Sequence, residues 1–343
     1  MHACPPLTFG SHHRIAKCGR DQLLLLVWRV GDIESGNYQR SPLLSLDQGN
    51  TSVMSKDPSR DPWDLIRAHQ YEEAVTAYDA KLAAGKEKWP EMIIANRATA
   101  LLCAGRLPEA LEGFSTANDI HRQSRATPQS APFLESMGTV LWLMGHRSVA
   151  KELYRSAADG IRFGTIAYAD IAGGVGQGLL LWYAGVTTKD RNATEHAVDY
   201  LTHLVKKPRI KNWPGPLAQF VIERRAQSLL PHAQSFRELL RDSFKTDNLR
   251  EVIEHAKSDV LTRRHLVQAL FVLGTKHRKK GDEDGCRRAF QQCAQLEHLY
   301  LDQEWYLAAA EVGLFPPGRA TVRDQRSHTS HSRSRQGARR RPS

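Results

Sequence analysis

The sequence predicts an all-α protein, a solenoid built from antiparallel helix pairs. Apolar residues recur with a helical period through residues 54–318, where strand signals are almost lacking. Within this range one spacing occurs three times: a glycine, a small residue five positions later, an aromatic residue nine positions later, and a second small residue twelve positions later. A helix pair of this kind cannot bury its own apolar face, so it has to stack on neighbouring pairs.

Each residue of the spacing has a physical reason. The glycine is expected just past the end of the first helix, where a left-handed residue turns the chain without a Cβ clash. The small and aromatic residues share one face of the second helix, because they are four and three positions apart. The three sets are Gly105, Ala110, Phe114 and Ala117; Gly145, Ala150, Tyr154 and Ala157; and Gly281, Cys286, Phe290 and Cys293.

The first helix of each pair carries its own small residue, seven positions before the glycine. These residues are Ala98, Gly138 and Gly274. A small side chain there lets the two helices cross closely. The alternative, ordinary amphipathic helices that align by chance, has to explain three coincidences in one register.

The spacing resembles the tetratricopeptide repeat, a helix-turn-helix unit of about 34 residues. Segment 134–157 matches it best, and segments 94–117 and 270–293 match nearly as well. A degenerate first unit carries Ala74 and Tyr78, with His69 in the glycine position. The resemblance implies a right-handed superhelical solenoid of roughly five to seven helix pairs, with a concave groove that binds a protein or peptide.

The chain divides into three zones. Residues 1–53 have no sustained helical period, so we expect either a poorly ordered arm or a stretch that precedes a true start at Met54. Residues 54–318 form the repeat domain, and residues 319–343 are expected to be a disordered tail rich in Arg, Ser and His. In chain order, helices are expected over 61–69, 71–84, 89–104, 107–121, 130–144, 147–162, 165–184, 192–206, 215–229, 233–244, 248–257, 262–280, 283–296 and 302–312.

One pair departs from the common spacing. Gly185 is expected to be its turn residue, and the loop up to Ala197 is longer than in the other units. The glycine-rich stretch 173–178 lies inside the first helix of this pair. It lacks the order and the Lys-Ser/Thr ending of a phosphate-binding loop, so close helix packing explains it better.

The charge of the chain is concentrated in the tail. Eight Arg and one acid, Asp324, give residues 319–343 a charge of +7 out of a formal net charge of +11. A basic tail on a nearly balanced domain indicates electrostatic attachment rather than sequence-specific reading of nucleic acid. The alternative to a repeat scaffold is therefore an adaptor that the tail holds to RNA or to an anionic membrane surface. A solvated tail without a fixed partner is the third possibility.

The sequence offers no recognisable catalytic or metal-binding motif. Acids and histidines occur without the spacing of a zinc site or a catalytic triad, so we expect neither an enzyme nor a cofactor. The longest apolar run, at residues 23–28, is far too short for a membrane helix. The cysteines show no disulfide framework, and three of them, Cys103, Cys286 and Cys293, fall at expected core positions. This pattern favours a reducing compartment such as the cytoplasm.

Candidate ligand contacts follow from the resemblance. In tetratricopeptide arrays the exposed face of each first helix lines the groove. The corresponding positions here are Thr99, Leu102, Glu135, Thr139, Trp142, Leu179, Trp182, Tyr183, Phe271, Thr275 and Arg278. The aromatic members Trp142, Trp182 and Tyr183 are either ligand contacts or packing between neighbouring repeats, and the sequence leaves both interpretations open.

The forty residues 273–312, near the end of the domain, are also similar to the end of bacterial tetratricopeptide adaptor lipoproteins. Those proteins bring enzymes to their clients. A lipobox is missing, since Lys17 stands before Cys18 where a small residue belongs. The similarity implies a bacterial, non-enzymatic protein-binding scaffold.

Overall fold

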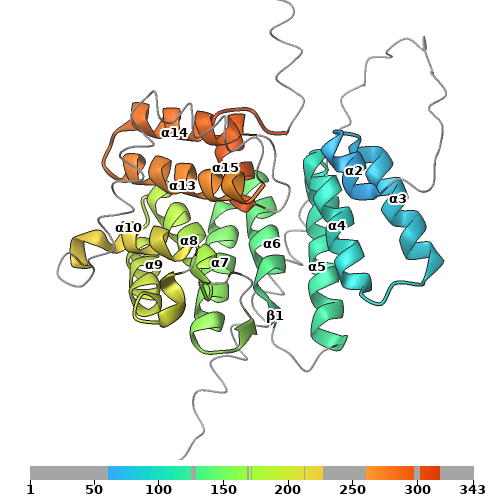
Figure 1. Ribbon diagram of the computed structural model, residues 1–343, viewed down its shortest axis with the longest axis horizontal. Helices are drawn as coiled ribbons and strands as arrows, with labels where there is room; N and C mark the ends of the chain where they lie inside the picture. The colour runs from blue at the N-terminus through green and yellow to red at the C-terminus, as the bar shows by residue number, and fades with distance from the viewer. Residues whose placement is uncertain are drawn as a thin grey trace, which may run out of the picture. The chain divides into compact units, whose positions relative to one another are not determined.

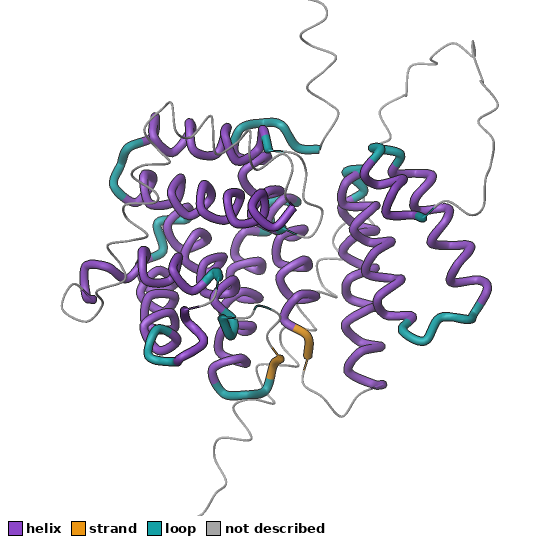
Figure 2. The backbone as a smooth tube through the Cα atoms, in the orientation of Figure 1, coloured by secondary structure: helices purple, strands orange, loops and turns teal. Residues whose placement is uncertain are grey.

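Helices make up most of the part of the chain that the structure describes, as Figure 1 and Figure 2 show. The computed structural model describes residues 61–124, 129–167, 170, 172–211, 213–226, 260–296 and 302–316. Within these ranges the strands have only two residues each, so the predicted all-α class is confirmed for this part of the chain. The expected arm 1–53, the tail 319–343 and the helices expected at 233–244 and 248–257 lie outside the described residues.

The first helix pair turns at a residue other than glycine. Helix α2 (Pro62–Arg67) begins after Asp61, whose side chain accepts a hydrogen bond from Trp63 N at 3.1 Å. Helix α3 (Tyr71–Ala84) follows after His69, which has a φ of 57°. His69 therefore takes the left-handed conformation of the glycine that it replaces in the degenerate unit.

The second pair, α4 (Pro90–Cys103) and α5 (Leu107–Ser124), turns at Gly105 with a φ of 78°. The helices approach so closely that a Cβ on Gly113 would lie 2.8 Å from Cβ of Ala98. Both helices thus use a small residue at the crossing, and Phe114 is buried beside it.

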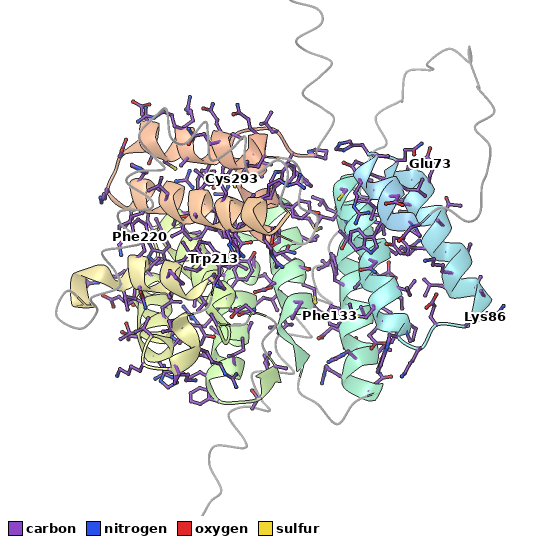
Figure 3. All side chains as sticks on the ribbon, viewed as in Figure 1. Glu73, Lys86, Phe133, Trp213, Phe220 and Cys293 are labelled. Carbon is purple, nitrogen blue, oxygen red and sulfur yellow. The ribbon has the colours of Figure 1, made fainter. Side chains whose placement is uncertain are left out.

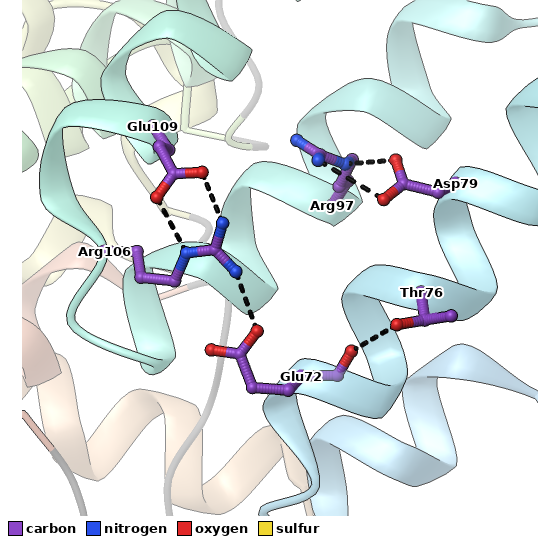
Figure 4. A network of polar contacts seen from close by, with 6 residues as sticks. All are labelled: Glu72, Thr76, Asp79, Arg97, Arg106 and Glu109. Carbon is purple, nitrogen blue, oxygen red and sulfur yellow. Dashed lines mark hydrogen bonds and ion pairs between the residues drawn. The ribbon is translucent and has the colours of Figure 1, made fainter.

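Exposed ion pairs join α3 to this second pair (Figure 4). Arg106 Nη1 lies 2.7 Å from Glu72 Oε2, and Arg106 Nε lies 2.8 Å from Glu109 Oε1. Arg97 Nε contacts Asp79 Oδ1 at 2.6 Å. Pairs in such exposed positions contribute less than about 1 kcal/mol each, so apolar burial carries most of the packing.

The helix pairs that contain the second and the third repeated set have the same geometry. Helices α6 (Ala131–Leu143) and α7 (Arg147–Arg162) turn at Gly145, and helices α13 (Val260–Lys279) and α14 (Glu283–Gln295) turn at Gly281; both glycines have positive φ. A Cβ on Gly138 would lie 2.5 Å from Cε1 of Tyr154, and one on Gly274 would lie 2.7 Å from Cε1 of Phe290. In both pairs the aromatic ring therefore fills the space that a larger side chain would need.

All the small and aromatic members of the three sets are buried. Their exposed fractions are between 0 and 3%. The set consists of Ala110, Phe114, Ala117, Ala150, Tyr154, Ala157, Cys286, Phe290 and Cys293. The spacing thus identifies the same kind of helix-helix interface in three helix pairs.

The pair α8 (Val175–Thr187) and α9 (Arg191–Leu204) corrects one prediction. Gly185 is not the turn residue, because α8 continues past it; the left-handed position is Lys189, with a φ of 55°. The connection is also short, running from Thr188 to Asp190, and the Asp190 side chain caps α9 by accepting from Ala193 N at 3.0 Å. Gly185 instead lets the helices touch, since its Cβ would lie 2.7 Å from Thr194 N.

The helix expected from residue 165 begins ten residues later than predicted. Strand β2 (Ile166–Ala167) pairs in parallel with β1 (Gln129–Ser130), and Gly173 and Gly174 both have positive φ. Left-handed glycines cannot belong to a right-handed helix. Gly173 and Gly174 therefore precede α8, and the glycine stretch lies only partly inside a helix.

Successive helices from α2 to α9 each pack on the next one, and α9 packs on α10 (Gly215–Ala226), which follows the short 3₁₀ helix η1 (Pro208–Lys211). Helix α13 then packs on α8. The last described helix, α15 (Gln303–Glu311), returns to α6 as well as to α13 and α14. This return contact is not part of the nearest-neighbour stacking that the repeat pattern predicts. The described residues include no helix that is both long and apolar enough to cross a membrane.

Candidate binding site

Helix α15 contacts the helices whose faces the sequence analysis expected to be open. These faces belong to the first helices of four pairs: α4, α6, α8 and α13. Tyr306 of α15 lies 3.3 Å from the Cys103 sulfur on α4, and Gln303 Nε2 donates to Ser136 Oγ on α6 at 3.2 Å. Tyr183 on α8 donates to Oε1 of Glu311 at 2.6 Å. One short helix therefore bonds to three first helices, and its contacts to α13 complete the set.

The C-terminal end of α15 is held to α13 by a bidentate ion pair. Arg278 places its two terminal nitrogens 2.8 and 3.0 Å from the carboxylate oxygens of Glu311. The two side chains are only 19% and 18% exposed. Hydrogen bonds from Arg278 and Tyr183 keep the pKa of Glu311 below its ordinary value although burial acts in the opposite direction. The charged pair thus holds α15 in place.

The structure places the predicted groove contacts mainly in the interior. Nine of the eleven have exposed fractions of 5% or less, which corrects the expectation that they line an open surface. They are Thr99, Leu102, Thr139, Trp142, Leu179, Trp182, Tyr183, Phe271 and Thr275. The other two, Glu135 and Arg278, are partly buried.

The aromatic cluster is packing between neighbouring helices. The Tyr183 ring lies 5.2 Å from that of Trp142 and 4.8 Å from that of Phe271, which joins α6, α8 and α13. Trp182 is 1% exposed. Of the two interpretations that the sequence left open, burial supports the structural one.

Beside the start of α15, four carboxylates from distant segments come together. We call Glu135, Asp170, Asp302 and Glu304 the acidic cluster. Glu135 lies on α6, Asp170 precedes α8, and the other two stand at the beginning of α15. A Cβ on Gly176 would lie 3.2 Å from Glu135 Oε1 and 3.8 Å from Asp170 Oδ2, so these two carboxylates flank the same point.

Asp170 is held by the glycine-rich stretch. Its Oδ1 accepts from Gly174 N at 2.9 Å and its Oδ2 from Gly176 N at 3.1 Å. The left-handed Gly174 aims these amides at the carboxylate, as an N-terminal cap of α8 does. The stretch therefore holds an internal carboxylate, where a phosphate-binding loop would hold a phosphate.

The two acids on α15 are bonded to α13. Arg264 Nε lies 2.6 Å from Oδ1 of Asp302, and Gln268 Nε2 donates to Oε1 of Glu304 at 3.3 Å. Gln268 also accepts from Trp213 Nε1 at 2.6 Å, and Figure 3 shows Trp213 beside α13. Glu304 and Asp302 are buried, whereas half of the Arg264 side chain is exposed.

Burial raises the pKa of every member of the acidic cluster, and neighbouring acids raise it further for Glu135, Asp302 and Glu304. Burial raises the pKa of Glu135 well above its ordinary value, and the charges of Glu304, Asp170 and Asp302 raise it further. Among the strongest influences, only the charge of Arg264 lowers it. Burial raises the pKa of Asp302 to about 7 despite its ion pair with Arg264. The pKa values of Asp170 and Glu304 are raised by burial too. The acidic cluster is therefore short of positive charge.

Two glutamines next to the acidic cluster have an unused hydrogen-bond acceptor. Gln177 donates its Nε2 to Glu135 Oε1, and Gln303 donates to Ser136, the next residue on α6. Both amide oxygens are buried and accept no hydrogen bond from the described residues. Gln177 is 1% exposed and Gln303 is 7% exposed. Each oxygen needs an N–H or O–H donor, because an unpaired buried acceptor is costly.

The described residues contain no group of three or more His, Cys, Asp or Glu side chains placed to bind a metal ion. The three described cysteines are free thiols in the core, as the sequence predicted, and burial raises the pKa of each. A thiol with a raised pKa is a weak nucleophile. The chemistry that this part of the chain offers is binding through carboxylates and amide oxygens.

Sequence reasoning found Glu135 as a groove position but missed the other three acids. One signal was available: Glu135 interrupts an apolar helix, where a carboxylate is rarely buried without a role. A scan of the chain against models of known protein families finds no match, and neither does a search of curated proteins.

Proposed function

We propose that this protein is a non-enzymatic scaffold that binds another polypeptide, in a right-handed superhelical array related to tetratricopeptide repeats. The thrice-repeated helix pair supports the repeat assignment, since solenoids of such pairs commonly serve as binding surfaces. The acidic cluster is the observation that carries the proposal. In this partly exposed cluster, carboxylates without a cationic partner lie next to glutamine amide oxygens that accept no hydrogen bond from the described residues. Neither feature stabilises the fold.

The location of the cluster distinguishes this proposal from a simple groove binder. Helix α15 already bonds to side chains on α4, α6, α8 and α13. A partner would instead approach where Glu135, Asp170 and Arg264 remain partly exposed. Within the proposal the protein works in a reducing compartment such as the cytoplasm, in keeping with its buried free thiols.

A photo-crosslinking experiment tests this function. Benzoylphenylalanine replaces Ala167, an exposed residue three positions before Asp170, and in a matched control it replaces Met92, which is 48% exposed on α4. In the native cell, we expect crosslinks to defined polypeptides from position 167 and few from position 92. The absence of polypeptide crosslinks at position 167 would contradict the proposal.

The tail supports a second candidate, an adaptor held to RNA or to an anionic membrane surface. Its +7 charge is the supporting observation. Replacing the eight tail Arg by Gln in the full chain separates the candidates. Salt-dependent binding to RNA or anionic vesicles should be lost in that variant if the adaptor proposal is right.

A further inference from the structure

The acidic cluster has the chemistry of a site for one cationic side chain. We propose that it binds the guanidinium group of an arginine, and this inference rests on the proposed function because the arginine belongs to a polypeptide. Glu135 and Asp170 would accept from the guanidinium on the partly exposed side. Gln177 Oε1 would accept a further N–H from the buried side.

The charge balance is the first argument. Four carboxylates stand in the cluster, and Arg264 is bonded to one of them, Asp302. Among the described residues, Glu135 and Asp170 bond to amide N–H groups rather than to a cation. Bringing further positive charge to such carboxylates is favourable because their mutual repulsion and partial desolvation strengthen the attraction.

The unused acceptors are the second and independent argument. The Gln177 amide already contacts Glu135 through Nε2, so its Oε1 lies at the cluster. It has no partner among the described residues and is shielded from water. Gln303 of α15 also has an unpaired amide oxygen, and it lies beside Ser136, the residue after Glu135 on α6. These acceptors call for a ligand with several N–H donors.

Arginine fits these requirements better than lysine. The guanidinium is planar, carries five N–H donors in a fixed arrangement, and is weakly hydrated. It can therefore serve two carboxylates and an amide oxygen together. A lysine ammonium offers three donors at one point and loses more hydration on burial.

The arginine can come from this chain or from another polypeptide. The tail holds eight Arg in its 25 residues, at 319–343, and the last described residue, Pro316, closely follows α15. A tail that binds in cis would act at an effective concentration of about 1 mM or more and would compete with an outside ligand. The chemistry of the site is the same for either source.

A peptide titration tests the proposal. The labelled probe is HSRSRQGARRRPS, the sequence of residues 331–343, and its versions with every Arg replaced by Lys or by Gln are the comparison. Binding is measured by fluorescence anisotropy to the full chain and to the full chain with its eight tail Arg replaced by Gln. We expect the Arg peptide to bind at least about tenfold more tightly than the Lys peptide, since bidentate guanidinium bonds are lost with lysine.

Variants then locate the site. Glu135→Gln should weaken binding of the Arg peptide by about tenfold or more, the loss expected for one charge-assisted hydrogen bond. Gln177→Leu should weaken it as well, and serves as the second test if Glu135→Gln does not fold. The matched control is Glu152→Gln, at an acid on α7 that is 46% exposed and paired with Arg155; it should leave binding unchanged.

The comparison of the two chains identifies the source. Tighter binding after the tail Arg are replaced means that the tail occupies the site in cis; equal binding means that the site serves another polypeptide. Both results support the site. Equal binding of the Arg and Lys peptides, or no effect of Glu135→Gln and Gln177→Leu in folded protein, would overturn it. If crosslinks persist at position 167 in that case, the proposed function stands and only the arginine site fails.

Discussion

The crossing of the repeated helix pair can be tested by adding one carbon atom. In the substitution Gly138→Ala the new Cβ would lie 2.5 Å from Cε1 of Tyr154 and 3.0 Å from Cδ1. Tyr154 is fully buried, so the ring cannot swing into solvent. Overpacking of this kind costs about 1–3 kcal/mol, whereas alanine gains about 1 kcal/mol over glycine in a helix. We expect a net loss of about 1 kcal/mol in the free energy of unfolding.

Urea unfolding followed by circular dichroism measures this change. Gly274→Ala should behave in the same way, because its Cβ would lie 2.7 Å from the Phe290 ring. Gly145→Ala is the matched control: it has open space around it but a φ of 89°, so it isolates the cost of the left-handed turn. If Gly138→Ala and Gly274→Ala both stabilise the protein, the close crossing does not exist and the repeat geometry is wrong.

Three further predictions concern the contacts that hold the helices. Glu311→Ala should lower the free energy of unfolding by about 3 kcal/mol in urea titrations, because it leaves the partly buried Arg278 unpaired; Glu195→Ala, in an exposed pair, should change it by less than about 0.5 kcal/mol. The free energy of unfolding should fall as the pH rises from about 5 to 8, because Asp302 has a pKa near 7 when folded and near 4 when unfolded, so the folded chain binds more protons in that window. Asp302→Asn should flatten this dependence, and an unchanged pH profile would count against the acidic cluster. Lys189→Gly should raise the thermal midpoint, since glycine adopts a φ of 55° without a Cβ clash; a lower midpoint would contradict the assignment of the turn.

The helix pairs could be predicted because their cause is local. A turn glycine, a small residue at a crossing and an aromatic ring opposite it stand at fixed distances along the chain, so the sequence displays all three. His69 shows that this reasoning extends to a degenerate unit, because its position in the pattern predicted its left-handed turn. Where the spacing failed, at Gly185, two kinds of glycine had been confused: one that turns the chain and one that allows close contact.

The covering of the first-helix faces could not be predicted, because it depends on a segment far away in the sequence. Helix α15 lies about 170 residues after α6, and nothing in a repeat pattern states where a terminal helix returns. The same holds for the acidic cluster, whose members come from three separate segments. The local hint was a carboxylate within an apolar helix, at Glu135. It indicates a buried acid without naming its neighbours.

These two features give the proposed scaffold a definite form. A repeat protein normally leaves its inner surface free for a ligand, but here Tyr183 and Arg278 are already engaged by Glu311. Groups that still need a partner lie at the start of α15. They are the carboxylates of the acidic cluster that bond to no cation among the described residues, and the amide oxygens of the two glutamines. Binding should therefore be electrostatic and directional, with hydrogen bonds providing most of the selectivity.

Hydrogen-deuterium exchange of the full chain, with its tail Arg replaced by Gln and with or without the Arg peptide, tests the central claim most directly. We predict slower exchange in residues 131–137, 170–177 and 302–304, the segments that carry the acidic cluster and its glutamines, and no change in α2 to α5. Protection spread over α2 to α5, or none at the three segments under saturating peptide, would contradict the account.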